Sequence, residues 1–360
     1  MLRSYDVDIL RSGMKVGRDV LDLDGSIVLK QNTVLDSDKI DALRRKNIFS
    51  VYIDEDEEEE EEEVGLDEYM LDSEYLDHYK RSYELMQTVY YQAAQGDGIN
   101  IRNLDAVLAP DNINLLCDVS TAVTQIHNMT RDGDYVIHHA TNVGILAGLM
   151  ARWLHYQNKP KREIVLAGLL SEIGKMKVPP EILNKKGKLD PDEMDKVKRH
   201  VDYGYDILKV SPLKIFRDVL LGVLQHHERC DGSGYPNRLR GDDISDFGKI
   251  IAILDIYDAM AANRSYARRN SPFDIFNVLF KDISRGKLDK KFGLLLMFRL
   301  RHSFNGCWVG LTNGKRAKII EIDEKRVTDQ PIVKTLKGEI INLNETPDLK
   351  VEAMLTAKEI

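Results

Sequence analysis

One eleven-residue stretch constrains the fold of this chain more than any other, because it joins a histidine pair to a tight turn. Residues 226–236 read HHERCDGSGYP. The apolar run before them, residues 219–224, predicts a buried helix that carries the pair into the interior. Glycine adopts backbone angles that other residues avoid and proline fixes one angle, so the turn is expected to form a shaped wall.

The histidine pair has two interpretations. Imidazole nitrogens are common protein ligands of divalent transition metals, so His226 and His227 are candidate ligands. Alternatively, the pair packs in the core and a plain Gly/Pro turn follows it. A second candidate ligand is Asp255, which lies in the apolar run of residues 250–256. A carboxylate is costly to bury there unless it is paired or bound to a metal.

These two stretches together carry a family resemblance. HHERCDGSGYP, followed by IIAILDIYDAM at residues 250–260, resembles the HD-GYP family of bacterial cyclic di-GMP phosphodiesterases. The resemblance covers about residues 130–285. It implies a mainly α fold with an HD-type helical bundle as its core. Around this core we expect a small α/β N-terminal domain and a small β appendage at the C-terminus.

The chain departs from the family at the pair of residues that gives the family its name. Where the family has His-Asp, this chain has Ser171-Glu172, and Gly174 and Lys175 keep the rest of the motif. Serine does not replace an imidazole as a metal ligand. Glu172 keeps a carboxylate on a side chain that is one methylene longer than aspartate.

The resemblance implies a set of metal ligands built from imidazoles and carboxylates: His139, Glu172, His200, His226, His227 and Asp255. The last three histidines would share one metal with Glu172. The same Glu172 would also bind a second metal, held by His139 and Asp255. This second metal would lack one ligand, because Ser171 stands where the family has a histidine. Asp258 is expected to orient a histidine.

Further roles also follow from the resemblance. Lys175 and Glu172 would be catalytic, and substrate would contact Lys175, Arg264 and Tyr235. The ligand set has no thiolate, so it suits iron or manganese and does not exclude zinc, with one or two ions per chain. Some family members support a third metal with a glutamate where this chain has Tyr135, so no third metal is expected.

Three functions remain open at this point. The first is a metal-dependent phosphodiesterase of reduced or absent activity that converts cyclic di-GMP to pGpG or GMP. The second is a module that binds cyclic di-GMP or a protein partner without turnover, with the loop at residues 226–236 as a partner surface. A purely structural helical module is hard to reconcile with so many histidines. Another cyclic dinucleotide is not excluded as the ligand, whereas DNA is not expected as a partner.

Composition divides the chain into segments. The expected organisation is an α/β module, an acidic linker, connecting helices, the HD-GYP domain and the β appendage, at residues 1–53, 54–66, 67–130, 131–300 and 301–360. Residues 54–63 are ten consecutive carboxylates, and without them the net charge changes from −8 to +2. The remainder therefore need not repel an anionic substrate.

Periodicity predicts several elements outside the core motif. Residues 10–16 and 19–29 read as strands, and residues 105–129 as a helix. Residues 67–95 predict a long helix with one aromatic-rich stripe, made of Tyr75, Tyr79, Tyr83, Met86 and Tyr90. The stripe has two interpretations: packing on the next domain, or the seam of a homodimer.

Cysteine content and hydropathy bear on the compartment. Cys117, Cys230 and Cys307 are scattered and odd in number, and no CxxC occurs, so three free thiols in the cytoplasm are expected. The sequence has no uninterrupted apolar run of about 18 residues, so no membrane span is expected.

Overall fold

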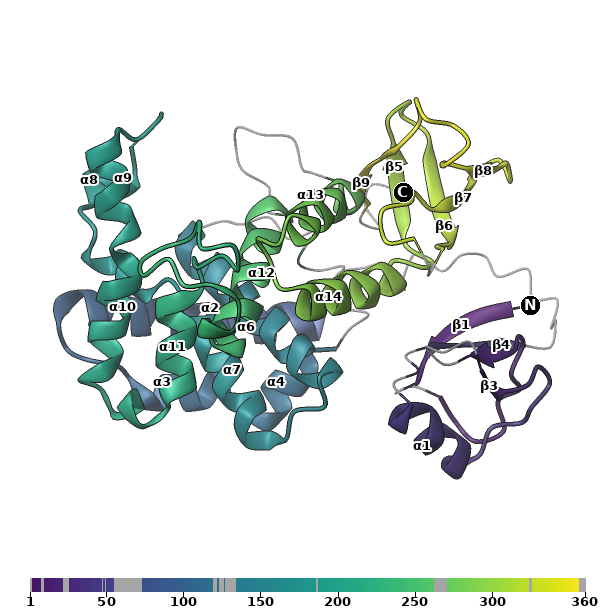
Figure 1. The fold of residues 1–360 in the computed structure, drawn as a ribbon, viewed down its shortest axis with the longest axis horizontal. Coiled ribbons are helices and arrows are strands. Elements are labelled where there is room, and N and C mark those ends of the chain that lie inside the picture. Colours follow the sequence, from purple (N-terminus) through teal and green to yellow (C-terminus); the bar gives the residue numbers. More distant parts are fainter. Residues whose placement is uncertain are drawn as a thin grey trace. The chain divides into compact units, whose positions relative to one another are not determined.

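The fold comes from a computed structural model, in which the chain divides into two compact units, Met1–Gly65 and Leu66–Ile360 (Figure 1). The structure describes residues 2–7, 10–21, 26–46, 48, 50–54, 73–118, 122, 126, 134–185, 187–261, 271–323 and 326–355. Most of the acidic run at residues 54–63 lies outside these ranges, as does the rest of the predicted linker.

The N-terminal unit is a small α/β module with its own core. Its elements are β1 (Leu2–Asp6), β2 (Val20–Leu21), β3 (Ile27–Leu29), α1 (Ser37–Arg45) and β4 (Ser50–Asp54). β1 pairs with β4 and β2 with β3, both antiparallel. The predicted strand at residues 10–16 is wrong: Gly13 has a φ of +100° in a turn, and Lys15 and Val16 form only isolated bridges.

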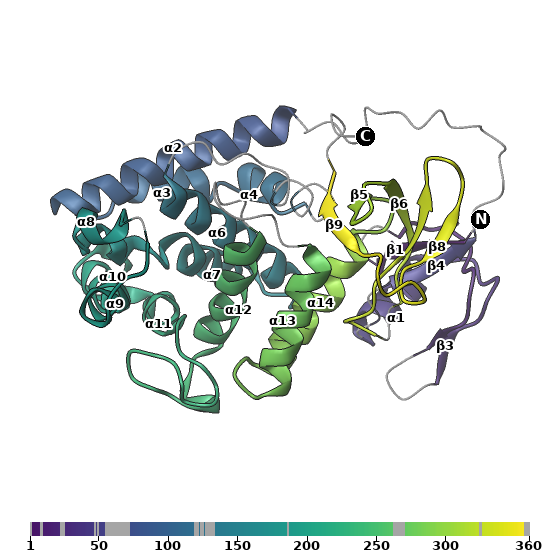
Figure 2. The ribbon, with the colours of Figure 1, turned by 90° about the horizontal axis from the view of Figure 1, so that it is seen from above.

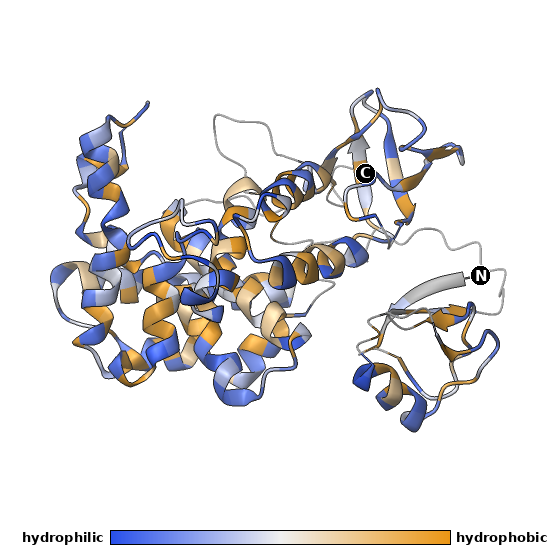
Figure 3. Ribbon diagram, viewed as in Figure 1, coloured by the Kyte–Doolittle hydropathy of each residue, from blue (hydrophilic) through white to orange (hydrophobic). Residues whose placement is uncertain are grey.

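The second unit is built mainly from helices. They are α2 (Ser73–Gln95), α3 (Ile101–Val107), α4 (Pro110–Leu116), α6 (Tyr135–Trp153), α7 (Asn158–Leu170), η3 (Ile173–Lys177), α8 (Pro180–Leu183), α9 (Pro191–Lys198), α10 (His200–Lys209), η4 (Pro212–Ile215), α11 (Arg217–Gln225), η5 (Gly241–Asp243), α12 (Asp246–Ala261), α13 (Pro272–Ser284) and α14 (Lys290–Ser303). α6 is central, because nearly all of its side chains are buried and it packs on α2, α7 and α12. In Figure 3 the hydrophobic residues concentrate on the helices around α7, α11 and α12.

The helix α2 packs along one side of the bundle, past α3, α4 and α6 (Figure 2). Its predicted stripe is buried inside this unit, with Tyr75, Tyr79, Met86 and Tyr90 each at most 2% exposed. The structure therefore supports the packing interpretation for these four residues, and the homodimer through residues 67–95 stays a prediction. The single helix predicted for residues 105–129 is wrong as well. α3 ends at Val107, and Pro110 begins a new helix because its fixed φ suits the first helical position.

A five-stranded antiparallel sheet follows the helices. Its strands are β5 (Trp308–Leu311), β6 (Arg316–Glu321), β7 (Ile332–Thr335), β8 (Ile340–Asn342) and β9 (Val351–Met354), in the order β8-β7-β6-β5-β9. An Asn313-Gly314 turn joins β5 to β6, and Gly314 has the positive φ of +79° that this turn requires. A mainly α fold with a small C-terminal sheet is thus confirmed.

Two further sequence expectations concern thiols and membranes. Cys117, Cys230 and Cys307 are all free, and the first and last are buried. None of the helices that the structure describes has the length and apolar character needed to cross a membrane.

Candidate metal centre

Three of the predicted ligands, His200, His226 and His227, lie at the ends of two helices. His226 caps the C-terminus of α11, whose apolar face is buried as predicted, and His227 follows it directly. His200 is the first residue of α10. The preceding helix, α9, begins with a capping box between Asp190 and Glu193, which fixes where the chain turns toward His200.

The remaining predicted ligands come from the centre of the bundle. His139 lies near the start of α6, Asp255 lies on α12, and Glu172 stands between α7 and η3. Because α6 packs on both α7 and α12, these three side chains meet in the interior. Glu172 is 1% exposed and His139 is 3% exposed.

The described residues form two groups of candidate ligands, in each of which the ligand atoms lie within 4.8 Å of one another. The first ligand group is Glu172, His200, His226 and His227. The second ligand group is His139, Glu172 and Asp255. The structure thus brings together all the predicted ligands in the predicted partition, with Glu172 shared. That they bind metal stays a prediction.

The imidazoles of His200 and His226 face each other in an arrangement that calls for a cation. Their Nε2 atoms are 3.3 Å apart, while each Nδ1 lies 2.8 Å from a backbone carbonyl, of Val197 and Val223 respectively. A carbonyl only accepts, so each Nδ1 carries the proton and each Nε2 presents a lone pair. Two lone pairs that converge in this way fit a divalent cation, as does the carboxylate beside them.

Protonation is not a good substitute for that cation. Burial lowers the pKa of His226 to about 4, and the neighbouring His200 lowers it in addition. Burial likewise lowers the pKa values of His200 and His227. The three imidazoles are therefore neutral at neutral pH, which is the form that binds metal.

Glu172 carries its negative charge inside the site. Burial alone would raise its pKa, but Lys175 and the surrounding histidines lower it well below the ordinary value. Lys175 Nζ lies 2.8 Å from Glu172 Oε2, and the imidazoles of His200 and His139 lie at 3.6 and 3.8 Å from its two oxygens. One carboxylate thus faces both ligand groups.

The second ligand group differs because its histidine is already held by carboxylates at both nitrogens. His139 Nε2 lies 2.9 Å from Asp255 Oδ1, and His139 Nδ1 lies 2.7 Å from Asp258 Oδ2. Burial would lower the pKa of His139, but the two carboxylates raise it well above its ordinary value. In the absence of metal, an imidazolium therefore supplies positive charge at this group.

Ser171 does not supply the ligand that the second group lacks. The residue is 2% exposed, and its hydroxyl donates to the carbonyl of Gly168, 2.9 Å away in the preceding turn of α7. The hydroxyl is therefore engaged with its own helix.

The loop at residues 226–236, called the GYP loop below, is held by a buried residue that the sequence analysis did not single out. Glu228 is 2% exposed and accepts hydrogen bonds from the backbone N–H groups of Asn237 and Leu239 at 2.7 and 3.0 Å. Gly234 lies so close to this segment that a Cβ would be 2.4 Å from the nitrogen of Arg229. These contacts fix the conformation of the loop, as the sequence predicted for the wall that follows the histidine pair.

Of the predicted substrate contacts, Tyr235 and Lys175 border the ligand groups. The ring of Tyr235 stacks on that of His227, with centroids 4.8 Å apart. Arg264 lies outside the residues that the structure describes.

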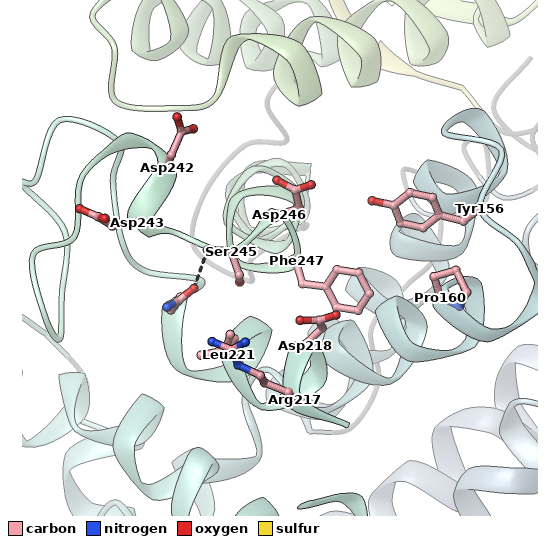
Figure 4. A pocket seen from close by; sticks show the side chains of 11 residues that line it. Tyr156, Pro160, Arg217, Asp218, Leu221, Asp242, Asp243, Ser245, Asp246 and Phe247 are labelled. Carbon is pink, nitrogen blue, oxygen red and sulfur yellow. Dashed lines mark hydrogen bonds between the residues drawn. The ribbon is translucent and has the colours of Figure 1, made fainter. Parts of the chain in front are cut away.

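A separate cavity of about 560 Å³ lies between α7, α11 and α12 (Figure 4). It is lined partly by apolar groups such as Tyr156 and Phe247 and partly by acidic ones such as Asp218 and Asp246. Gln225, the neighbour of His226, turns its carbonyl to the N–H of Ser245 at 2.8 Å. None of the candidate metal ligands lines this cavity, so it is not the metal centre.

Comparison with known proteins agrees with this geometry. Residues 113–291 match the family described as HD domain. The chain is 36% identical over 161 residues to 3'3'-cGAMP-specific phosphodiesterase 2 of Vibrio cholerae serotype O1, which covers 43% of this chain and 31% of that protein. It is 40% identical over 121 residues to the cyclic di-GMP phosphodiesterase response regulator RpfG of Xanthomonas campestris pv. campestris, which covers 34% of this chain and 32% of RpfG. The chain thus spans about a third of the length of these curated relatives.

The fold has a counterpart among solved structures. Bd1817, a HDG"Y"P protein from Bdellovibrio bacteriovorus, matches with a TM-score of 0.50 and 16% identity, over 82% of this chain and 98% of that chain. Residues 113–291 thus match an HD domain, and the chain shares the fold of this solved HDG"Y"P protein. The two relatives are named as phosphodiesterases of 3'3'-cGAMP and of cyclic di-GMP, which agrees with the resemblance that the sequence motifs carry.

Proposed function

We propose that this protein is a metal-dependent member of cyclic di-GMP signalling whose phosphodiesterase activity is reduced or absent. The observation that supports it best is the pair of unprotonated Nε2 atoms of His200 and His226, 3.3 Å apart beside the carboxylate of Glu172. His200, His226, His227 and Glu172 would hold a divalent metal, with iron or manganese as the first candidates.

The chain's own side chains would share the work on a phosphodiester. A divalent metal in the first ligand group would neutralise phosphoryl charge and lower the pKa of water. Lys175, at the edge of this group, would add a fixed cation, and Arg264 would add another. The ring of Tyr235 would form a wall beside His227 against which a nucleotide can pack.

Reduced activity follows from the second ligand group. Its members are two carboxylates and one imidazole, and Ser171 is turned toward Gly168. A bound imidazolium at His139 competes with a second metal for the same carboxylates. We therefore expect one tightly bound metal per chain and poor activation of the attacking water.

The substrate class is inferred from the relatives. RpfG is named a cyclic di-GMP phosphodiesterase, and the Vibrio cholerae relative is named 3'3'-cGAMP-specific. We propose cyclic di-GMP as the ligand of this chain, acting in the cytoplasm, and 3'3'-cGAMP as the comparison compound in every assay.

One experiment tests this function: metal content and turnover of cyclic di-GMP measured on the same sample. We expect about one metal per chain and slow or undetectable release of pGpG or GMP. The double change Ser171→His with Glu172→Asp should raise both the metal content and the turnover. Two metals with rapid turnover in the unchanged chain would contradict the reduced activity, and a protein without affinity for metal would contradict the whole proposal.

The second candidate is a module that binds cyclic di-GMP without hydrolysis. The hydrogen bond from Ser171 to Gly168 favours this candidate, because it keeps the serine hydroxyl away from the second metal. Among the described residues, that ligand group holds only His139, Glu172 and Asp255. The same assays separate the two. Binding of cyclic di-GMP that weakens in Arg264→Ala, with no turnover even after Ser171→His and Glu172→Asp, would select this candidate.

A further inference from the structure

A line of buried hydrogen bonds connects α2 to the metal centre, and we name its members Tyr79, Asn142, Asp258 and His139 the α2 relay. The hydroxyl of Tyr79 donates to Asn142 Oδ1 at 2.9 Å, and Asn142 Nδ2 donates to Asp258 Oδ1 at 2.8 Å. Asp258 Oδ2 lies 2.7 Å from His139 Nδ1. All four side chains are at most 3% exposed, so water does not compete for these bonds.

The direction of each hydrogen bond in the α2 relay is fixed by chemistry. A carboxylate oxygen only accepts, so Asn142 must turn its NH₂ group toward Asp258. The amide oxygen of Asn142 then faces Tyr79, which must donate. The oxygen of Tyr79 is left to accept from His138 Nδ1 at 3.1 Å. The ring of His138 is in turn stacked on Tyr83, with centroids 4.1 Å apart.

The relay ends at a nitrogen that decides how His139 is presented. With its Nδ1 proton held by Asp258, His139 turns Nε2 toward Asp255 and Glu172, at 2.9 and 3.8 Å. A histidine whose outer nitrogen is fixed in this way keeps one tautomer and one ring orientation. Tyr79 belongs to α2, which precedes the HD domain at residues 113–291.

We propose that Tyr79 is a positioning residue for the second ligand group: through Asn142 and Asp258 it fixes the tautomer and orientation of His139. The inference rests on the proposed metal-binding function. It also means that α2, a helix outside the matched HD domain, contributes a side chain that positions a candidate metal ligand. If α2 shifts along α6, the relay transmits that shift to His139.

Tyr79→Phe is the direct test, because it removes one oxygen and leaves the ring in place. Asn142 would lose its donor and could turn its amide, which would release Asp258. Tyr75→Phe is the matched control: it removes the same atom from the same buried stripe one helical turn earlier, and Tyr75 is not a member of the relay. If Tyr79→Phe does not fold, Asn142→Asp breaks the next link, since a carboxylate there cannot donate to Asp258.

The first readout needs no metal. In chelator-treated protein labelled with ¹⁵N-histidine, we expect His139 to show the ¹⁵N shifts of an imidazolium and a downfield Nδ1–H proton held by Asp258, both in the unchanged chain and in Tyr75→Phe. In Tyr79→Phe that signal should shift or broaden. Unchanged His139 signals in Tyr79→Phe would overturn the inference, whatever the metal content of the protein.

The second readout uses Mn²⁺ titration in the Ser171→His background, where two binding events are expected. Tyr79→Phe should weaken the second event about tenfold, the lower end of the effect of removing an outer partner of a metal ligand, and leave the first unchanged. Equal weakening of both events, or no weakening, would show a merely structural role. If Ser171→His binds no Mn²⁺, the proposed metal-binding function fails, and if it binds one ion, Ser171 alone does not account for the weak second site. In both cases the ¹⁵N readout still decides the role of Tyr79.

Discussion

Among single residues, Glu172 carries a charge that the interior must balance with or without metal. It is 1% exposed, and Lys175 lies 2.8 Å from one of its oxygens. Burial would lower the pKa of Lys175, but Glu172 raises it, so the pair is ionised. In the metal-free chain this lysine is the cation in closest contact with the shared carboxylate among the described ion pairs.

Replacing Lys175 should show how much its positive charge stabilises the buried carboxylate of Glu172. Lys175→Met leaves a buried carboxylate without its partner, so we expect the unfolding free energy of chelator-treated protein to fall by about 3 kcal/mol. With saturating Mn²⁺ the loss should be smaller, because the metal supplies the missing positive charge. Urea unfolding with and without Mn²⁺ measures both values. Lys177→Met, at an exposed lysine two residues on, is the control, and an equal loss with and without metal would contradict the prediction.

At the residue scale, the sequence predicted the candidate ligands but not what holds them. The family resemblance picked out His200 and Asp255, and Asp255 also stands out locally as a carboxylate within an apolar run. The contact between Tyr79 and Asn142 joins residues 63 positions apart. No local pattern encodes such a contact, so α2 had to be seen against α6 before the relay could be found.

Among the elements, the contact of η3 with α10 holds the two ligand-bearing segments together. A Cβ on Gly174 would lie 1.8 Å from the carbonyl oxygen of His200 and 2.5 Å from the nitrogen of Gly204. Backbone therefore touches backbone at this point. The contact keeps Glu172, two residues before Gly174, beside His200.

Gly174→Ala should separate these segments. The added methyl must push η3 away from α10, and we expect an overpacking loss of about 1–3 kcal/mol together with at least tenfold weaker Mn²⁺ binding. Gly148→Ala is the matched control, because its methyl meets Cys117 Sγ at 2.3 Å in a part of the core remote from the ligands. Thermal unfolding and Mn²⁺ titration are the measurements. If Gly174→Ala keeps full Mn²⁺ affinity, the contact does not position Glu172.

Elements with local signals were predicted well, and those that depend on distant partners were not. α11 and α2 follow from the apolar run at residues 219–224 and from the aromatic-rich stripe between residues 75 and 90. β1 was missed because it is a strand only by pairing with β4, about fifty residues later. The acidic run near β4 lies mostly outside the described residues, so the linker stays a prediction.

For the whole molecule, the buried imidazoles make the stability of the metal-free protein depend on pH. His226 has a pKa of about 4 in the folded chain and about 6.5 when unfolded. Between these values the unfolded chain binds a proton that the folded chain does not, so stability falls as pH falls through this window. His139, with its raised pKa, stays protonated in the folded chain throughout this window, so it adds only a small slope just below pH 6.5, where its unfolded form is still taking up a proton.

We expect chelator-treated protein to lose about 2 kcal/mol of unfolding free energy between pH 6.5 and pH 5 on account of His226 alone. Urea unfolding at several pH values in this range measures the slope. His226→Gln removes one titrating group, so the slope should become shallower, while His200 and His227, whose pKa values are also lowered, keep part of it. A native chain whose stability stays constant from pH 6.5 to pH 5 would rule out a neutral, buried His226.

The burial of the α2 stripe decides how far the chain can be shortened. Met86 and Tyr90 are fully buried against the bundle, although α2 ends well before residue 113, where the HD domain begins. A fragment cut at that boundary would leave an apolar face of α6 in water and remove the anchor of Asn142. The smallest autonomous piece of this protein must therefore start no later than Ser73, some forty residues upstream of the family boundary.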